Sequence, residues 1–346
     1  MLPRPSARHP LALTLLVLLI CGLMAALTFQ PARPFLSNWL APGQSTTNDA
    51  PIAGSFTPQA TTGVAALERY NQGSSLQEDV ADGRVRFFRR DLPGGGAIAY
   101  FVVMLDEQVH IEVVNADGAI PGSDASGDTI WTDGEKHLAT VEEIARAPYA
   151  ARDGMQLLGA MAFGFHGTVR TADEGTVVIN GRVHRVNPGR AALCISGARA
   201  RIGLFDAQQA RACEQAIGAG PVILWQGKIA NPDVGAATDA FVPFNPLGED
   251  FVLLDWRKKI YTGQYPKSVV GVGAREDGRS YLVLLVSYGV TGVELTAQLK
   301  AMGCTEALGG DDDTSTQAVW RGAPIRRSAV QEVPDALAVY TRGATQ

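Results

Sequence analysis

Residues 176–186 read TVVINGRVHRV, and this stretch indicates the class of fold to which the chain belongs. Two short runs rich in β-branched residues flank the dipeptide Asn180-Gly181. Asn-Gly is preferred in type I′ turns, because both central residues of that turn need a positive φ and its twist matches that of paired strands. The stretch therefore predicts a β-hairpin with strands at 176–179 and 182–186.

Similar signals continue on both sides of this hairpin. Apolar or alternating runs that end at turn residues predict further strands. They cover 85–90, 97–105, 109–114, 157–165, 192–196, 200–205, 221–225, 228–230, 269–273, 281–287, 318–320 and 336–340. Predicted helices are fewer and cover 64–70, 140–147, 206–217 and 293–302. We therefore expect an α+β fold with a mixed, mostly antiparallel sheet and a few helices.

The N-terminal part of the chain has a different character. Residues 11–29 are uncharged and apolar, long enough to span a bilayer as a helix, and residues 1–10 contain Arg4 and Arg8. Positive charge before the span favours a cytoplasmic N-terminus and a domain on the periplasmic or extracellular side. We therefore expect a single-pass transmembrane signal anchor, with the membrane as its partner. A cleaved signal peptide is the alternative.

Residues 30–62 are rich in Pro, Ser, Thr, Gly and Ala and show no period. Such a segment cannot bury a core and is typical of a disordered linker. Residues 63–346 follow as the folded domain. The formal net charge is −5 and no Lys- or Arg-rich run occurs, so nucleic acid is not expected as a partner.

The domain contains three cysteines, Cys194, Cys213 and Cys304, and no Cys-x-x-Cys pair. An odd number does not fit a complete disulfide framework. A single bridge between Cys194 and Cys213 fits an oxidising compartment, whereas three buried thiols fit the pattern equally well. The sequence alone leaves both interpretations open.

Residues 307–315, ALGGDDDTS, are the most unusual segment of the domain. They follow a predicted helix, and the double glycine favours a tight loop that carries three consecutive carboxylates. Asp311, Asp312 and Asp313 could bind a hard divalent cation such as Ca²⁺ or Mg²⁺ through oxygen. Adjacent like charges also raise the pKa of one partner, which suits a general acid or base. A solvated acidic turn with neither role is the alternative, so no cofactor is required.

Two other residues stand next to predicted strands. His166 ends the apolar run 157–165 and is followed by glycine, so it can approach a ligand closely or serve as a hydrogen-bonded structural histidine. Lys267 precedes the strand at 269–273 and can hold a phosphate or carboxylate as a point charge, or remain an ordinary exposed lysine. No Walker A, Gly-x-Ser-x-Gly or His-Glu-x-x-His motif occurs in the chain.

The order of several short segments resembles the phosphodiester glycosidase family. The similar segments are TVEEIA (140–145), AFGFH (162–166), AGP (219–221), PKSVVG (266–271) and GGDDDTST (309–316). The last four correspond to the family patterns Asn-x-Gly-Phe-Phe, a Gly-Pro turn, Pro-Arg-Thr-Ala-x-Gly and Asn-Leu-Asp-Gly-Gly-Gly-Ser-Ser. The resemblance runs from about Val85 to Thr341, which is nearly the whole domain.

The resemblance implies a hydrolase of the cell envelope that cleaves a sugar-1-phosphodiester or a related glycoside. Its partner would be a glycan or sugar-phosphate substrate. It implies that Asp311 lies nearest the anomeric carbon. His166 stands where the family pattern has phenylalanine, and our own hypothesis is that it is the proton donor or a hydrogen-bond partner. The residues that it assigns to substrate binding are Lys267, Gly164, Gly220, Pro221 and Ser315.

Several positions depart from the family pattern. The family asparagine is Ala162, and the family arginine is Lys267, which makes a single-point contact where arginine grips two phosphate oxygens. The glycines after the motif aspartate are Asp312, Asp313 and Thr314. Two extra carboxylates repel a phosphodiester unless a cation intervenes. The alternative function is therefore a catalytically degenerate module of the same fold that binds a glycan or a protein.

Overall fold

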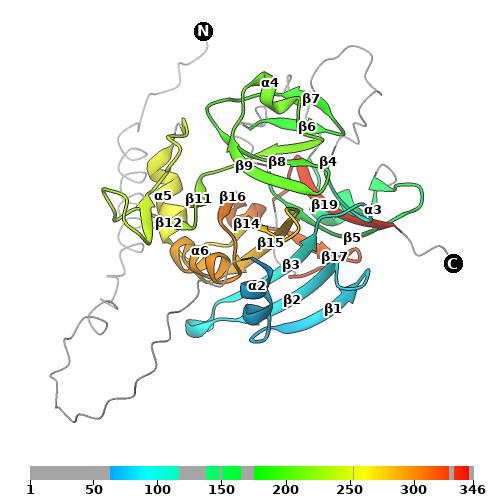
Figure 1. The fold of residues 1–346 in the computed structure, drawn as a ribbon, viewed down its shortest axis with the longest axis horizontal. Coiled ribbons are helices and arrows are strands. Elements are labelled where there is room, and N and C mark those ends of the chain that lie inside the picture. The colour runs from blue at the N-terminus through cyan, green and yellow to red at the C-terminus, as the bar shows by residue number, and fades with distance from the viewer. Residues whose placement is uncertain are drawn as a thin grey trace, which may run out of the picture. The chain divides into compact units, whose positions relative to one another are not determined.

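The computed structural model describes residues 63–116, 138–147, 150–164, 175–251, 253–326 and 331–342. All of them belong to the second of two compact units, which spans residues 58–346. The helices are α2 (Val64–Asn71), α3 (Val141–Arg146), α4 (Ala207–Ala210), α5 (Leu254–Thr262) and α6 (Gly292–Ala301) (Figure 1). Two short 3-10 turns are η1 (Pro93–Gly95) and η3 (Asp313–Ser315).

Strands dominate the described part of the chain. They are β1 (Ser75–Val80), β2 (Val85–Asp91), β3 (Ala97–Met104), β4 (Val109–Asn115), β5 (Met155–Ala162), β6 (Val177–Ile179), β7 (Arg182–Arg185), β8 (Ala191–Ser196), β9 (Arg199–Leu204), β10 (Gln215–Gly218), β11 (Val222–Trp225), β12 (Lys228–Asn231), β13 (Phe241–Pro243), β14 (Lys267–Ala274), β15 (Ser280–Tyr288), β16 (Glu306–Asp312), β17 (Ala318–Trp320), β18 (Ala323–Pro324) and β19 (Asp335–Arg342).

The strands form three sheets. The largest has nine strands in the order β1-β2-β3-β15-β14-β16-β11-β12-β13. Two five-stranded sheets have the orders β7-β6-β10-β8-β9 and β18-β17-β5-β19-β4. The central pairs are antiparallel, whereas β12 and β13 are parallel. The prediction of a sheet-rich α+β fold with mostly antiparallel pairing is confirmed.

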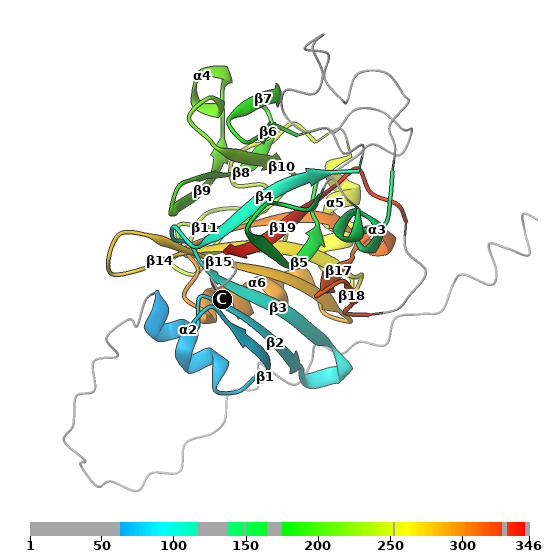
Figure 2. The ribbon, with the colours of Figure 1, turned by 90° about the vertical axis from the view of Figure 1, so that its right-hand side faces the viewer.

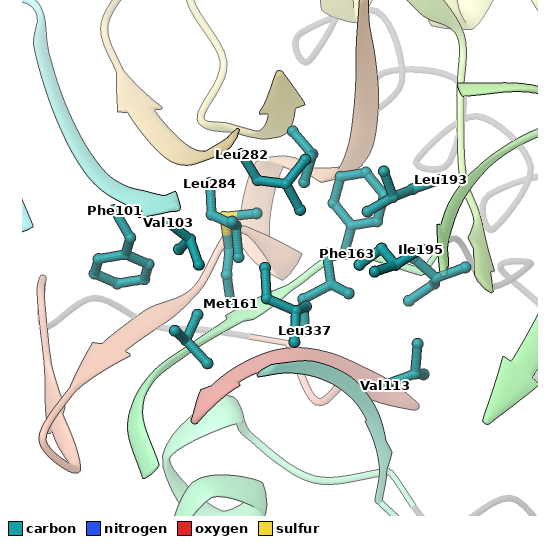
Figure 3. Close-up of a cluster of buried hydrophobic side chains, with 14 of the residues drawn as sticks. Phe101, Val103, Val113, Met161, Phe163, Leu193, Ile195, Leu282, Leu284 and Leu337 are labelled. Atoms are coloured by element: carbon teal, nitrogen blue, oxygen red, sulfur yellow. The ribbon is translucent and has the colours of Figure 1, made fainter. Parts of the chain in front are cut away.

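The main hydrophobic core lies where the three sheets face one another (Figure 2). Figure 3 shows side chains from each sheet meeting there, among them Phe101 and Leu284 from the large sheet, Met161 and Leu337 from one small sheet, and Leu193 from the other. All five are at most 1% exposed. Each strand of the nine-stranded sheet contributes alternate residues to this core. We call the side of the large sheet that packs against the two small sheets its sandwich face.

The opposite face of the nine-stranded sheet is covered by helices. Leu67 of α2, Tyr261 of α5 and Leu295 of α6 belong to a second apolar cluster with strand residues such as Val283. We call this side the helix face. A strand that passes through the large sheet therefore directs its side chains alternately toward the sandwich core and toward the helices.

Local signals in the sequence correspond to the observed turns and caps. Asn180 and Gly181 have φ values of 49° and 77°, so they form the turn with positive φ that was predicted between β6 and β7. Thr140 caps α3 with a reciprocal capping box to Glu143. These elements need no distant partner, which is why the sequence predicts them.

Two predictions of secondary structure are wrong, and one helix was missed. The helix expected at 206–217 is only α4, because residues 215–218 form a fully buried strand that pairs with β6 and β8. The loop expected at 307–315 is mostly strand β16, which lies between β14 and β11. Helix α5 was not predicted, and its N-cap residue, Leu253, makes no side-chain capping bond. In the first two cases pairing with distant strands overrides local preference.

One disulfide bond links Cys194 of β8 to Cys213, which follows α4, and Cys304 is a buried free thiol. This outcome selects the bridged alternative among those that the sequence left open. The bond closes a loop with a sequence separation of 19 residues, and both cysteines belong to a small apolar cluster between α4 and β8.

Removing this bond is expected to lower the free energy of unfolding by about 3 kcal/mol, because the unfolded chain regains the entropy of a loop of this length. The measurement is urea denaturation of the double variant Cys194→Ala/Cys213→Ala beside the wild type. The double variant should be insensitive to reductant, whereas reductant should destabilise the wild type. An unchanged denaturation midpoint would show that the bridge contributes nothing.

The predicted anchor at 11–29 and linker at 30–62 lie outside the described residues. Among the residues that the structure does describe, no helix is both long enough and apolar enough to cross a bilayer.

Candidate active site

The segments singled out in the sequence meet where β16 ends and β14 begins. Residues 267–269 of β14 oppose residues 309–312 of β16, so β16 carries one extra residue at Gly310-Asp311. Such a β-bulge changes the direction of the side chains that follow it and recurs beside active sites. Here Asp312 faces helix α5, where its carboxylate pairs with Arg257.

Asp311 lies at the junction of two sheets. It is 5% exposed, and its N–H donates to the carbonyl of Phe163 at 2.9 Å. Its Oδ1 accepts from the N–H of Asp312 at 3.0 Å. Beyond it the chain passes through η3, where Ser315 is also buried, and enters β17 of a small sheet. The carboxylate is therefore held where the chain crosses between layers.

Gly164 lies next to this junction, and the packing around it leaves no room for a side chain. Its N–H donates to Oδ1 of the buried Asp335 at 2.9 Å. A Cβ at this position would lie 2.2 Å from Oδ2 of Asp335, which no side-chain atom tolerates. The predicted substrate-binding glycine thus fixes the end of β5 against β19. The next motif position, His166, lies outside the described residues.

Asp312 faces the helices and pairs with an arginine that the sequence analysis did not identify. Nη1 of Arg257 in α5 lies 3.3 Å from Oδ2 of Asp312, with side chains 5% and 18% exposed. The two residues line a cavity together with Lys267, Gly220 and Pro221. The cavity measures about 30 Å³, which is room for about one or two water molecules.

Burial shifts the pKa of Asp312 strongly. Desolvation raises it to about 7, with the charges of Asp311 and Asp313 acting in the same direction and those of Arg257 and Lys267 against it. A carboxyl group with a pKa near 7 can hold or release a proton at neutral pH. Asp312 is therefore suited to general acid or base chemistry, which needs such a pKa.

Lys267 is buried rather than exposed. Its Nζ donates to the carbonyls of Gly263 at 2.7 Å, Tyr265 at 2.8 Å and Val290 at 3.0 Å. Desolvation lowers its pKa to about 8, partly offset by the charge of Asp312. Since these bonds use all three of its protons, a contact with phosphate would require Lys267 to give up one of them.

The Gly220-Pro221 turn adjoins the same strand end. Its peptide bond is cis, Gly220 N–H donates to the Gly309 carbonyl at 2.8 Å, and Gly309 N–H donates to the Pro221 carbonyl at 3.0 Å. The buried carboxylate of Glu249 lies behind the turn and accepts from the N–H groups of Ala191 and Val222 at 3.0 and 2.8 Å. Glu249 thereby ties β8 to β11 and supports the turn.

Replacing Gly220 with alanine is expected to lower the free energy of unfolding by about 3 kcal/mol. Its φ is +121°, and a Cβ would lie 2.5 Å from Oε1 of Glu249. Gly227→Ala is the matched control, because Gly227 also has a positive φ, +74°, but its Cβ would meet nothing within 4 Å. Urea denaturation should show a cost of about 1 kcal/mol for the control. Equal costs would show that the Glu249 contact is unimportant.

The three consecutive aspartates do not converge. Of the three, Asp312 lines the cavity beside Arg257, and Asp313 is exposed with its N–H bonded to the carbonyl of Pro266. Within the described residues, no group of three or more His, Cys, Asp or Glu side chains is placed to hold a metal ion. The geometry therefore lends the predicted Ca²⁺ or Mg²⁺ site no support, and that site stays a prediction.

The comparisons with known proteins bear on this arrangement. A family model described as phosphodiester glycosidase matches residues 157–340, which is more than half of the chain. The chain belongs to the phosphodiester glycosidase family. The matched range contains the Gly164, Gly220-Pro221, Lys267 and Asp311 positions, so the resemblance that the sequence indicated is confirmed.

Solved structures agree with this fold. A hypothetical protein from Synechocystis has a TM-score of 0.56 at 12% identity, with 78% of this chain and 64% of that chain covered. The zebrafish N-acetylglucosamine-1-phosphodiester alpha-N-acetylglucosaminidase catalytic domain, auto-inhibited by its pro-peptide, has a TM-score of 0.50 at 16% identity. That match covers 82% of this chain and 94% of the other. At these identities the likeness concerns the fold, and no curated protein sequence matches the chain.

Proposed function

We propose that this phosphodiester glycosidase family member is a hydrolase that cleaves a sugar-1-phosphodiester or a related glycan of the cell envelope. The observation that carries the proposal is the bulge in β16, which presents Asp311 and Asp312 side by side at the end of a strand. Glycoside hydrolysis generally uses two carboxyl groups with different protonation states. The raised pKa of Asp312 supplies one that holds a proton near pH 7.

In the proposed reaction the bond between the anomeric carbon and the phosphate oxygen breaks. Asp311 stabilises the positive charge that develops on the sugar, the phosphate leaves with the bonding electrons, and water adds its oxygen to the anomeric carbon. The proton released by water passes to a nearby base. We keep His166, which stands where the family pattern has phenylalanine, as a proton donor or hydrogen-bond partner, and Asp312 is a second group able to carry the proton.

Lys267 stands where the family has arginine, and this difference alters how the substrate would bind in this proposal. The ammonium of Lys267 is held by three carbonyls and has no proton left for phosphate. Arg257 is a second cationic side chain beside the same cavity. Arginine suits phosphate because its planar guanidinium donates two parallel hydrogen bonds. We assign phosphate recognition to Arg257 once Asp312 is protonated, with Lys267 orienting the strand end.

We further propose that the domain lies outside the cytoplasm, tethered by residues 11–29. The apolar run and the preceding arginines support this, because they have the length and polarity of a signal anchor. The disulfide between Cys194 and Cys213 supports it independently, since such bonds persist in oxidising compartments.

The test is an assay of the full chain, purified in detergent, against a panel of nucleotide-sugars and sugar-1-phosphodiesters, with released sugar as the readout. Release of free sugar is the expected result. If no panel member is cleaved while the protein melts cooperatively, the second candidate gains: a non-catalytic module that binds a glycan or a protein. The small size of the cavity at Arg257 and the engaged ammonium of Lys267 favour that candidate.

A further inference from the structure

A second cavity lies on the same nine-stranded sheet, away from Asp311. It has a volume of about 890 Å³, which is within the usual range for small-molecule sites. Its walls come from β1, β2, β3 and β15 and from the residues that follow β18 (Figure 2 shows these strands). The residues that matter to its chemistry are Arg89, Asp91, Tyr288 and Arg326.

The shape of this cavity follows from small residues on β3. Ala97 pairs with Tyr288 of β15, and Ala99 pairs with Arg89 of β2, so two alanines form a low floor between larger neighbours. Two residues further along β3, Phe101 fills the same face of the sheet. The hollow therefore begins where the large core side chains stop.

Guanidinium groups surround the hollow. Arg326 lies over the ring of Tyr288, with its Cζ 4.3 Å from the ring centroid, and Arg89 stands on the opposite wall. Arg90, the next residue on β2, points to the helix face instead, where its Cζ lies 4.2 Å from the ring centroid of Tyr70 and its Nη1 donates to the Tyr70 carbonyl at 3.1 Å.

Within the part of the chain that the structure describes, neither Arg89 nor Arg326 forms an ion pair with a carboxylate. Asp91 is the single acidic residue among those that line the hollow. Arg89 and Arg326 against one aspartate give a local positive charge, although the formal net charge of the whole chain is −5. Clustered arginines with open donors are characteristic of sites for phosphate or carboxylate groups.

The hollow lies at the same level of the sheet as the candidate active site. Asp312 pairs with Lys267, Lys267 with Ser287, Ser287 with Ile98, and Ile98 with Arg90. Since neighbouring strands are about 4.8 Å apart, the four steps from β16 to β2 span about 19 Å.

We propose that this hollow binds an anionic group carried by a saccharide, with Arg89 and Arg326 as the groups that recognise it. That the anion is carried by a saccharide rests on the proposed function, whereas the anion site itself rests on the arginines and the cavity. Ser75, which pairs with Arg89 across β1 and β2, adds a hydroxyl group to the wall, and its Oγ accepts from Nε2 of Gln77 at 2.9 Å.

The test is isothermal titration calorimetry of the full chain with a hexose 6-phosphate, the uncharged hexose and a hexuronate. We expect the hexose phosphate or the hexuronate to bind and the uncharged hexose to bind at least tenfold more weakly. The double variant Arg89→Gln/Arg326→Gln should weaken binding of the charged sugar at least tenfold. Comparison of the hexose 6-phosphate with the hexuronate shows whether the site prefers a phosphate or a carboxylate group.

The matched control is Arg199→Gln/Arg211→Gln, which removes the same charge from two exposed positions outside the hollow. It should bind like the wild type. No binding of either charged sugar, equal binding by the Arg89/Arg326 variant, or an equal loss in the control would overturn the proposal. Because the readout is binding, the result does not depend on turnover. Binding of the charged sugar without hydrolysis of any substrate would contradict the proposed reaction and support the anion site.

Discussion

Replacing Asp311 with asparagine is expected to lower kcat by at least about 10³-fold on any substrate that the chain hydrolyses, which corresponds to about 4 kcal/mol of transition-state stabilisation. Asparagine has nearly the same shape, so the packing around this buried residue should persist. It cannot carry the negative charge that stabilises a developing positive charge on the sugar. The effect should therefore appear in kcat rather than in KM.

The control for this variant is two residues away. Asp313→Asn removes one charge from the same run of aspartates, but Asp313 is exposed and has a φ of 56°, which asparagine tolerates. Its kcat should stay within a factor of about three of the wild type. Thermal melting of both variants checks the fold. An Asp311→Asn variant that keeps more than a tenth of wild-type kcat would remove Asp311 from the centre of the reaction.

Several parts of the fold were predictable because their signals are local. Hairpin β6–β7 follows from Asn180-Gly181, and the end of α6 follows from Gly303, whose φ of +82° no residue adopts as readily as glycine. Strands β14 and β15 were also predictable, because both of their faces are buried and their sequences are therefore long apolar runs.

Other parts were not predictable because distant contacts determine them. The sequence GGDD at the end of β16 has a low strand propensity, and it is extended because β14 pairs with it. Similarly, Arg257 belongs to a short helix without a side-chain cap, and only the fold brings it to Asp312. Sequence reasoning therefore found the motif positions but missed the arginine and the bulge that give them their chemistry.

The pH dependence of stability offers a test of Asp312 that needs no substrate. Burial raises its folded-state pKa to about 7, above the value of 3.8 for an unperturbed aspartate. Between pH 4 and 7 the folded state therefore binds more protons than the unfolded state. By linkage, the stability that this group contributes is present at low pH and is lost as the pH rises through this window.

We expect the free energy of unfolding of the wild type to fall by about 3 kcal/mol relative to that of Asp312→Asn between pH 4 and 7. Asparagine does not titrate, so the variant lacks this slope. Loss of the partner of Arg257 shifts the variant curve, but that shift is the same at every pH in the window because arginine stays charged. Lys267, with a pKa lowered to about 8, changes charge mainly above the window.

The measurement is urea denaturation at half-unit steps of pH, with Asp313→Asn as the control for removal of a neighbouring charge. The control should run parallel to the wild type, because its carboxylate is exposed. If the Asp312→Asn curve also runs parallel to the wild type, Asp312 titrates as an ordinary surface aspartate and cannot hold a proton at neutral pH. A diverging curve would instead show that the bulge in β16 places a protonated carboxyl group beside an ionised arginine, which is the condition that a proton donor at this site requires.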